Sequence, residues 1–198
     1  MVRFSITVLT AVSSVVAVTT CNAGDRLRIH LDDSSPALHM PVGNRLDEVE
    51  PAFEDYAYML FDVCNAMGLT SDECMIYPLN GALGGNAIAT IEDGNRVIVY
   101  DRELSPLIGS DGAEMVVAHE VAHHFCGHLG TPTDATQELE VDLFAGAAMR
   151  LMGRSLNGAL SAVDLFSERP SKSHPARGDR IDAITAGWNR PEVGKVCG

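Results

Sequence analysis

The sequence is poor in basic residues, and it has no long apolar run beyond its first residues. It contains 14 Lys and Arg against 27 Asp and Glu, which gives a formal net charge of −13 at pH 7. Nucleic acids and anionic membranes attract surfaces rich in Lys and Arg, so this charge argues against both as partners. Because no apolar stretch after residue 23 is long enough to cross a bilayer, we expect no membrane span in the mature chain.

The first 23 residues are typical of a signal peptide. Arg3 supplies a positive charge, and residues 4–18 are apolar or small without any charge. This segment has the length of a signal-peptide core, and the small residues before position 24 suit cleavage. A buried N-terminal helix or a membrane anchor is the alternative, and residues 18–21 also loosely resemble a site for lipid attachment at Cys21. We expect an exported chain, periplasmic or secreted, with cleavage favoured over lipidation.

No CxxC pair is present, which leaves a zinc finger or a thioredoxin-type redox site without support. Beyond Cys21 four cysteines remain. This even number predicts two disulfides in an exported chain, and four free thiols are the alternative. Three pairings are possible, and the sequence alone does not choose among them. The favoured pairing joins Cys64 to Cys74 across a short loop and Cys126 to Cys197.

The length of 198 residues suits a single domain. Residues 24–44 are polar and show no sustained period, so we expect a linker there and one domain over residues 45–198. Apolar residues at three- and four-residue intervals predict a helix over 45–67. Further signals predict strands at 75–79, 86–91 and 96–100, the last two as a hairpin, and helices at 112–126, 131–152, 156–166 and 176–188. A small sheet followed by helices predicts an α+β domain.

The strongest chemical signal is the motif HExxH at residues 119–123. On a helix, His119 and His123 lie four positions apart on one face, so both imidazoles can bind a single ion. Glu120 can act as a general base on a water molecule without ligating the metal. Zinc in catalytic sites takes three protein ligands and a water molecule. A third protein ligand is therefore required.

The metzincin pattern HExxHxxGxxH does not supply that ligand, because Cys126 and Leu129 occupy the positions of its Gly and last His. The next predicted helix does. Glu138 and Asp142 are four residues apart on one face, so Glu138 can reach the metal while Asp142 orients a ligand histidine. Glu140 lies on another side of this helix and is expected to face elsewhere. A solvated acidic face is the alternative interpretation of this cluster.

These motifs together resemble the HExxH…ExxAD pattern of HtpX-type and CAAX-prenyl-protease-type zinc peptidases. The match includes residues 119–124 and 138–145. Residues 86–89 resemble the edge strand that borders the catalytic cleft in this family, and residues 173–175 with Arg180 resemble its C-terminal HP…RI segment. The resemblance covers roughly half of the chain. It implies a zincin-like (gluzincin) domain, mostly helical, with a small sheet whose edge strand flanks the active site.

The resemblance also implies roles for individual residues. Asn86, Ala87 and Ile88 would contact an extended peptide substrate, and Arg180 would pair with a carboxylate of the site. His174 would donate to the oxyanion of the tetrahedral intermediate or bind the metal reversibly, with a surface or capping role as the alternative. The chain departs from the pattern at Val141, where Ala is usual, and by its lack of a membrane span. It therefore looks like a soluble, minimal relative.

Two further histidines, His124 and His128, are also four residues apart. We expect them to point away from the face of His119 and His123 and to be structural or surface residues, with a second metal site as the alternative.

The sequence predicts an exported endopeptidase with one Zn²⁺ per chain, Glu120 as the general base and a protein or peptide as the substrate. One rival interpretation is a narrow processing protease that uses the same site on a single partner. Another is a non-enzymatic or autoinhibited zinc-binding regulatory module with a plugged cleft. An intact Glu120 argues against the latter, because a structural zinc ion needs no base.

Overall fold

The computed structural model of the chain describes residues 28–29, 38–42, 45–130 and 134–197. The predicted signal peptide, the lipid-attachment position Cys21 and the predicted helix start at residues 131–133 lie outside these residues. The described part is an α+β structure, as predicted.

Six strands of the described residues form one mixed sheet in the order β1-β2-β3-β4-β6-β5. Neighbouring strands are antiparallel except β4 and β6, which run parallel. β5 therefore lies at an edge, with β6 as its partner among the described strands. The strands are β1 Arg28–Ile29, β2 Leu38–Val42, β3 Arg45–Pro51, β4 Ile76–Gly81, β5 Ala87–Glu92 and β6 Asn95–Tyr100.

The predicted hairpin is confirmed as β5 and β6. Its turn residues, Asp93 and Gly94, have positive φ angles of 49° and 80°. A two-residue hairpin turn of this kind requires positive φ at both positions, which Asp-Gly tolerates well. The turn places β5 antiparallel to β6 from Ala87 opposite Tyr100 to Glu92 opposite Asn95.

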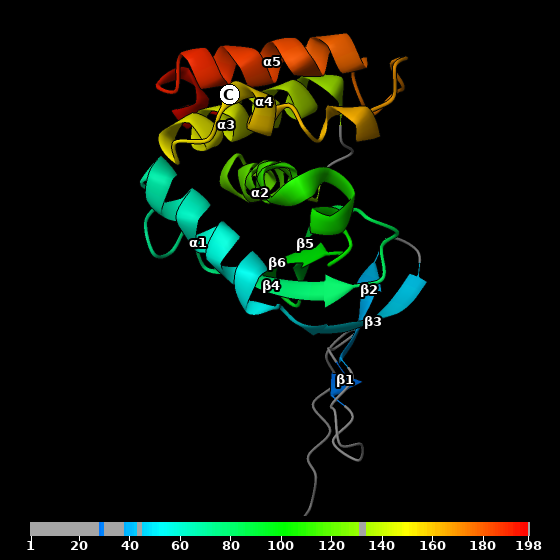
Figure 1. Ribbon diagram of the computed structural model, residues 1–198. Helices are drawn as coiled ribbons and strands as arrows, with labels where there is room; N and C mark the ends of the chain where they lie inside the picture. Colours follow the sequence, from blue (N-terminus) through cyan, green and yellow to red (C-terminus); the bar gives the residue numbers. More distant parts are fainter. Residues whose placement is uncertain (1–27, 30–37, 43–44, 131–133, 198) are drawn as a thin grey trace, which may run out of the picture.

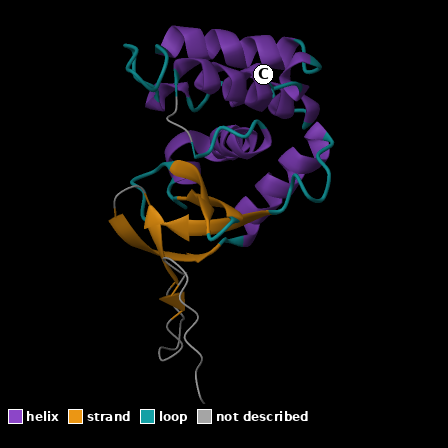
Figure 2. Cartoon of the chain, turned by 180° about the vertical axis from the view of Figure 1, so that it is seen from behind, coloured by secondary structure: helices purple, strands orange, loops and turns teal. Residues whose placement is uncertain are grey.

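The helices lie on one side of the sheet. Figures 1 and 2 show α2 between the sheet and the pair formed by α3 and α5, with α1 alongside. The helices are α1 Glu54–Met67, α2 Leu104–Phe125, α3 Ala135–Leu151, α4 Leu156–Ala159 and α5 Arg177–Asn189, with single 3₁₀ turns η1 Val163–Leu165 and η2 Val193–Lys195.

Two glycines permit the close packing of α3 against α5. A Cβ atom at Gly146 would overlap the carbonyl oxygen of Ile184, and one at Gly187 would overlap that of Leu143. Since backbone atoms cannot move aside cheaply, any larger residue at either position would push the two helices apart. This contact fixes α3, which carries part of the candidate site.

The main core lies between α2, the sheet and the other helices. Ala118, Val121 and Ala122 of α2 are fully buried in it. Burying one Val or Leu side chain contributes about 1.5–3 kcal/mol to folding. The helix that carries the motif is therefore held firmly on both of its faces.

The N-terminal part of the domain corrects two predictions. Residues 45–51 form β3 rather than the start of the predicted helix, and α1 begins at Glu54. Pro51 explains the difference, because proline disrupts a helix interior and disfavours helical geometry in the residue before it. The predicted linker over residues 24–44 is also wrong in part. It contains β1 and β2, and Met40 of β2 is fully buried in a smaller apolar cluster with Val49 of β3.

The favoured cysteine pairing is confirmed. Cys64 is bonded to Cys74 with a Cα–Cα distance of 6.0 Å, and Cys126 is bonded to Cys197 with a distance of 5.3 Å. The second bond ties the C-terminal segment to the end of α2. Disulfides of this kind persist in oxidising compartments and are therefore compatible with an exported protein. No helix within the described ranges has the length and apolar character needed to cross a membrane.

Candidate metal centre

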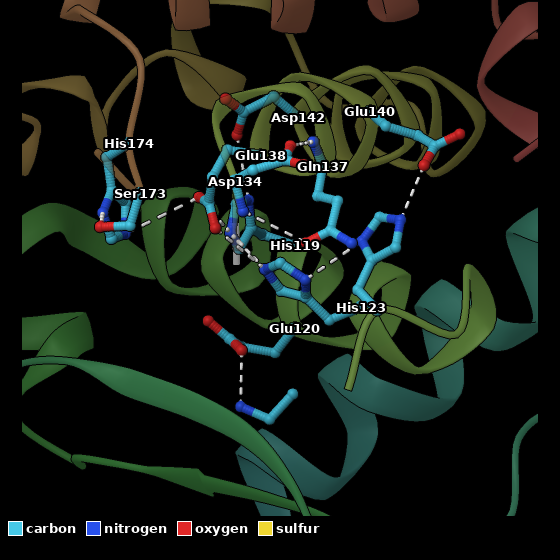
Figure 3. A network of polar contacts seen from close by, with 12 residues as sticks. His119, Glu120, His123, Asp134, Gln137, Glu138, Glu140, Asp142, Ser173 and His174 are labelled. Carbon is cyan, nitrogen blue, oxygen red and sulfur yellow. Dashed lines mark hydrogen bonds and ion pairs between the residues drawn. The ribbon is translucent and has the colours of Figure 1, made fainter. Parts of the chain in front are cut away.

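Three side chains from two helices converge where α2 packs against α3. The Nε2 atoms of His119 and His123 lie 3.2 Å apart. Each faces Glu138, whose Oε2 is 3.5 Å from His119 Nε2 and whose Oε1 is 3.5 Å from His123 Nε2. Figure 3 shows the three side chains turned toward one another. This group could bind a metal ion.

The start of α3 sets the position of Glu138. The Asp134 side chain accepts hydrogen bonds from the backbone N–H groups of Thr136 and Gln137, and the Gln137 side chain accepts one from the Asp134 N–H. This reciprocal capping arrangement begins the helix at Ala135. Glu138 consequently lies in the first turn of α3, facing the histidines of α2.

The separations of the three donors suit a tetrahedral metal site. With metal–ligand bonds of about 2.0–2.1 Å, the ligand atoms of a tetrahedral centre lie about 3.3–3.4 Å from one another. The Nε2 atoms of the two histidines lie 3.2 Å apart, and each lies 3.5 Å from a different oxygen of the Glu138 carboxylate, so both nitrogens and the carboxylate are close to that spacing. The residues present therefore fit a small divalent cation by both donor type and spacing.

The other nitrogen of His119 is held by a buried ion pair. Asp142 Oδ1 lies 3.0 Å from His119 Nδ1. Arg180 donates to the same carboxylate from Nε at 2.6 Å and from Nη2 at 2.8 Å. Asp142 is fully buried, and the Arg180 guanidinium also lies over the ring of Phe166. The structure thus brings Asp142 and Arg180 beside the cluster of His119, His123 and Glu138, as the helical spacing predicted for Asp142 and the resemblance implied for Arg180.

Burial and neighbouring charges shift the pKa values of His119, His123 and Glu138 in different directions. Burial alone would lower the pKa of His119, but its hydrogen bonds to Asp142 and Glu138 outweigh burial and raise the pKa to about 10. Burial and the positive charge of His119 lower the pKa of His123 to about 3. Burial would raise the pKa of Glu138, but the hydrogen bond with His119 and nearby positive charges lower it to about 2. At neutral pH His119 is therefore protonated on both ring nitrogens in the metal-free cluster, and a cation that binds its Nε2 would displace one of these protons.

Glu120 lies between this cluster and the edge of the sheet. Its Oε2 accepts a hydrogen bond of 2.6 Å from the backbone N–H of Ala89 in β5. Burial raises the pKa of Glu120 above its usual value. Figure 3 shows Glu120 beside the two histidines. A carboxyl group with a raised pKa next to a candidate metal site is suited to accept a proton near neutral pH.

A cavity of about 660 Å³ opens over these residues. The predicted substrate-contacting residues Asn86, Ala87 and Ile88 line it, together with the cluster and His174. Asp101 fixes the loop that leads into β5, because its Oδ2 accepts hydrogen bonds from the N–H groups of Leu83 and Gly85 at 2.9 and 3.0 Å. The cavity thus has the cluster of His119, His123 and Glu138 on one side and a sheet edge on the other.

His174 lies at the rim of the cavity. Its Nε2 is 3.9 Å from Glu138 Oε2, its Nδ1 is 2.8 Å from Ser173 Oγ, and its side chain is 54% exposed. Figure 3 shows His174 and Glu140 on opposite sides of the cluster. The catalytic role expected for His174 stays a prediction.

The predicted direction of the His128 side chain is wrong. The ring does not point away from the site, because its Nδ1 lies 3.4 Å from Nδ1 of His123. The cause is a chain reversal after α2, where Gly127 has a φ of 70° and the His128 N–H bonds to the His123 carbonyl. Glu140 faces away from the cluster, as predicted, but it contacts His128 Nε2 at 2.7 Å. The glycine just past the helix end was the signal available in the sequence.

His124 is the structural residue that was predicted. Its side chain is buried, and its Nε2 lies 3.0 Å from the carbonyl oxygen of Val97 in β6. Burial lowers its pKa to about 4, so the ring is neutral at physiological pH. His124 therefore links α2 to the sheet.

Searches of family models, of curated proteins and of solved structures find no match for this chain. The features of the chain that bear on its function are the converging donors of His119, His123 and Glu138 and the buried carboxylate beside them.

Proposed function

We propose that the chain is an exported, zinc-dependent endopeptidase. The observation that carries this proposal is the convergence of three metal-binding donors beside Glu120 in one cavity. Two imidazoles and one carboxylate form a ligand set found in catalytic zinc sites, which keep a fourth position for water or substrate. His119, His123 and Glu138 would be the zinc ligands.

The proposal includes a zincin-like fold of the HtpX and CAAX-prenyl-protease type. Three features support it. The ligands come from two consecutive helices, Asp142 supports the first histidine, and β5 borders the cavity as an edge strand. A purely structural zinc site would need neither a cavity nor a buried carboxylate next to the ligands.

The reaction would be hydrolysis of a peptide bond. A bound zinc ion would supply Lewis acidity and lower the pKa of a water molecule to about 7. Glu120 would take a proton from the attacking water and pass it to the leaving amine. Its raised pKa suits this exchange, and the hydrogen bond from Ala89 orients the carboxylate through Oε2.

The substrate would lie extended along β5. The N–H of Ala89 is directed toward Glu120 rather than toward β6, so alternate backbone groups of this strand face the cavity. An extended peptide can add to such an edge through main-chain hydrogen bonds. Residues 86–88 would then contact the substrate, and His174 at the rim would face it from the other side.

Substitution of Glu120→Gln tests the proposal most directly. The variant should retain one zinc ion per chain, because Glu120 is not among the three donors, while peptide cleavage should fall by at least about 10²–10⁴-fold. Glu138→Gln is the matched control, since the same chemical change on a ligand should weaken zinc binding. The measurements are metal analysis and digestion of a peptide library.

Two results would contradict the proposal. Cleavage by Glu120→Gln at the wild-type rate would show that Glu120 is not the general base. A wild-type protein that binds zinc stoichiometrically but cleaves no peptide in the library would favour the non-enzymatic zinc-binding module instead.

A further inference from the structure

Two polar residues beside the candidate metal site have no part in the chemistry described above. His128 is buried next to His123, and Glu140 contacts the far side of the His128 ring. The contacts form a chain from Glu140 Oε2 to His128 Nε2 at 2.7 Å and from His128 Nδ1 to His123 Nδ1 at 3.4 Å. His123 thus has a polar contact on the side opposite its Nε2.

Only one arrangement of protons is compatible with these contacts when Glu140 is a carboxylate anion and the imidazoles of His128 and His123 are neutral. The Glu140 carboxylate only accepts, so His128 must carry its proton on Nε2. His128 Nδ1 is then an acceptor and must receive the Nδ1–H of His123. His123 is left with an unprotonated Nε2, the atom that faces His119 and Glu138.

We propose that His128 and Glu140 are positioning residues that set the tautomer and orientation of His123 for metal binding through Nε2. The inference rests on the proposed function, since it concerns the same zinc site. Groups that orient a ligand histidine through its second nitrogen commonly affect metal affinity by about 10–100-fold. Here an imidazole transmits the influence of the carboxylate, which does not touch the ligand itself.

The local structure holds this pair in place. The His128 N–H bonds to the His123 carbonyl at 3.1 Å, which ties the residue after the helix to the ligand-bearing turn. Cys126, two residues earlier, is anchored to Cys197 by a disulfide. Glu140 projects from α3, two residues beyond Glu138. The same two helices that supply the ligands therefore also supply this support.

A second metal site is the competing interpretation of these residues. Ligand atoms of Cys126, His128 and Glu140 lie within 4.8 Å of one another. The sulfur of Cys126 is bonded to Cys197, however, and the thiolate is the form that binds metals. With the disulfide intact, the group lacks its sulfur ligand, and the role toward His123 is favoured.

Zinc affinity of the full disulfide-bonded protein tests the inference, with a competing chelator to measure the dissociation constant. His128→Leu and Glu140→Ala should each weaken zinc binding by about tenfold or more. His128→Asn should recover part of the loss, because the Asn side-chain oxygen can occupy the place of the imidazole Nδ1. His124→Leu is the matched control. It removes a neighbouring buried histidine that contacts the sheet, and it should leave zinc affinity unchanged.

Nitrogen NMR of the histidine rings supplies a readout that a merely structural role would not change. In the zinc-loaded wild type, His123 should be protonated at Nδ1 and His128 at Nε2. In Glu140→Ala, which alters a partly exposed side chain and should fold, the signal of His128 should shift toward a mixture of tautomers.

The outcomes separate the two proposals. Wild-type protein that binds no zinc would refute the proposed function and this inference with it. Wild-type protein that binds zinc, with unchanged affinity in both His128→Leu and Glu140→Ala, would overturn this inference alone. A second equivalent of zinc that binds wild type and is lost in Glu140→Ala would instead favour the second metal site.

Discussion

The two histidines of the HExxH motif are supported by different chemistry. His119 contacts the fully buried carboxylate of Asp142, which is held by Arg180. At its Nδ1, His123 contacts a second imidazole, His128, and the partly exposed carboxylate of Glu140 lies on the far side of that imidazole. One side of the site is a buried ion pair, and the other is a chain of hydrogen bonds that ends near the surface.

The difference appears in the protonation of the two histidines. Burial opposes charge on both rings, but the carboxylates around His119 outweigh it and raise the pKa to about 10. His123 has no carboxylate at its Nδ1, and its pKa is lowered to about 3 by burial and by the charge of His119. We therefore expect Asp142 and Arg180, on the His119 side, to govern folding stability and the pH dependence of zinc binding. His128 and Glu140, on the His123 side, should govern the orientation of His123.

Among the supporting residues, Asp142→Ala should have the largest effect on zinc affinity. It is therefore the strongest test of the difference between the groups that support His119 and those that support His123. The substitution removes the acceptor of His119 and leaves Arg180 buried without its carboxylate. Breaking a buried pair from one side costs about 3–5 kcal/mol of folding free energy, and loss of the acceptor should weaken zinc binding by about 10–100-fold. Urea unfolding of the metal-free protein and chelator competition measure the two effects.

Glu140→Ala is the natural comparison on the other side. It should weaken zinc binding but change the free energy of unfolding by less than about 1 kcal/mol, because its contact with His128 lies near the surface. If Glu140→Ala destabilised the metal-free protein as much as Asp142→Ala, the two supports would not differ in the way we infer.

The sequence predicted the His119 side well because each step depends on helical spacing. His119 and His123 are four residues apart, as are Glu138 and Asp142, and that interval alone places each pair on one helix face. Arg180 came from the resemblance to known peptidases. The hairpin of β5 and β6 was predictable for a similar reason, since Asp93 and Gly94 specify the turn locally.

The His123 side was not predicted, because it depends on the path of the chain beyond the end of α2. Helical periodicity places His128 away from the motif, but α2 ends at Phe125 and the chain reverses at Gly127. The N-terminal strands were not predicted either, because their pairing is not local. Val49 of β3 opposes Gly81 of β4, 32 residues further along the chain, and no periodicity within residues 45–51 reports that contact.

The change of zinc affinity with pH should be intermediate in size, and it should arise from the titration of His119. The pKa of His119 is raised to about 10, so the proton that zinc must displace stays bound throughout the neutral range. His123 and Glu138 have pKa values of about 3 and 2 and do not change protonation there. Zinc affinity should therefore increase by about tenfold for each unit of pH between 6 and 8.

Asp142→Asn sharpens this measurement. Without the carboxylate charge, the pKa of His119 should fall toward its ordinary value of about 6.5, and the slope should flatten above that pH. Glu140→Gln should leave the slope unchanged. A wild-type affinity independent of pH between 6 and 8 would place the displaced proton elsewhere and would contradict the contrast between the two histidines.

His174→Ala should have the smallest effect on zinc affinity, because His174 contacts neither support. Its side chain is 54% exposed and lies 3.9 Å from Glu138 Oε2. Exposed ion pairs contribute about 0–1 kcal/mol, which corresponds to at most about fivefold in a dissociation constant. If His174 donates to the oxyanion, kcat should nevertheless fall by about 10²–10³-fold with little change in KM.

Ser173→Ala is the control for His174, since it removes only the hydroxyl group beside His174 Nδ1. It should lower kcat less than His174→Ala does and leave zinc affinity unchanged. The informative comparison is between the effect on zinc affinity and the effect on kcat. A loss of zinc affinity beyond tenfold in His174→Ala would identify this histidine as a metal ligand. The site would then have a third histidine ligand, with Ser173 beside its second nitrogen. Unchanged kcat would make His174 a surface residue, and another donor that lines the cavity would then have to stabilise the oxyanion.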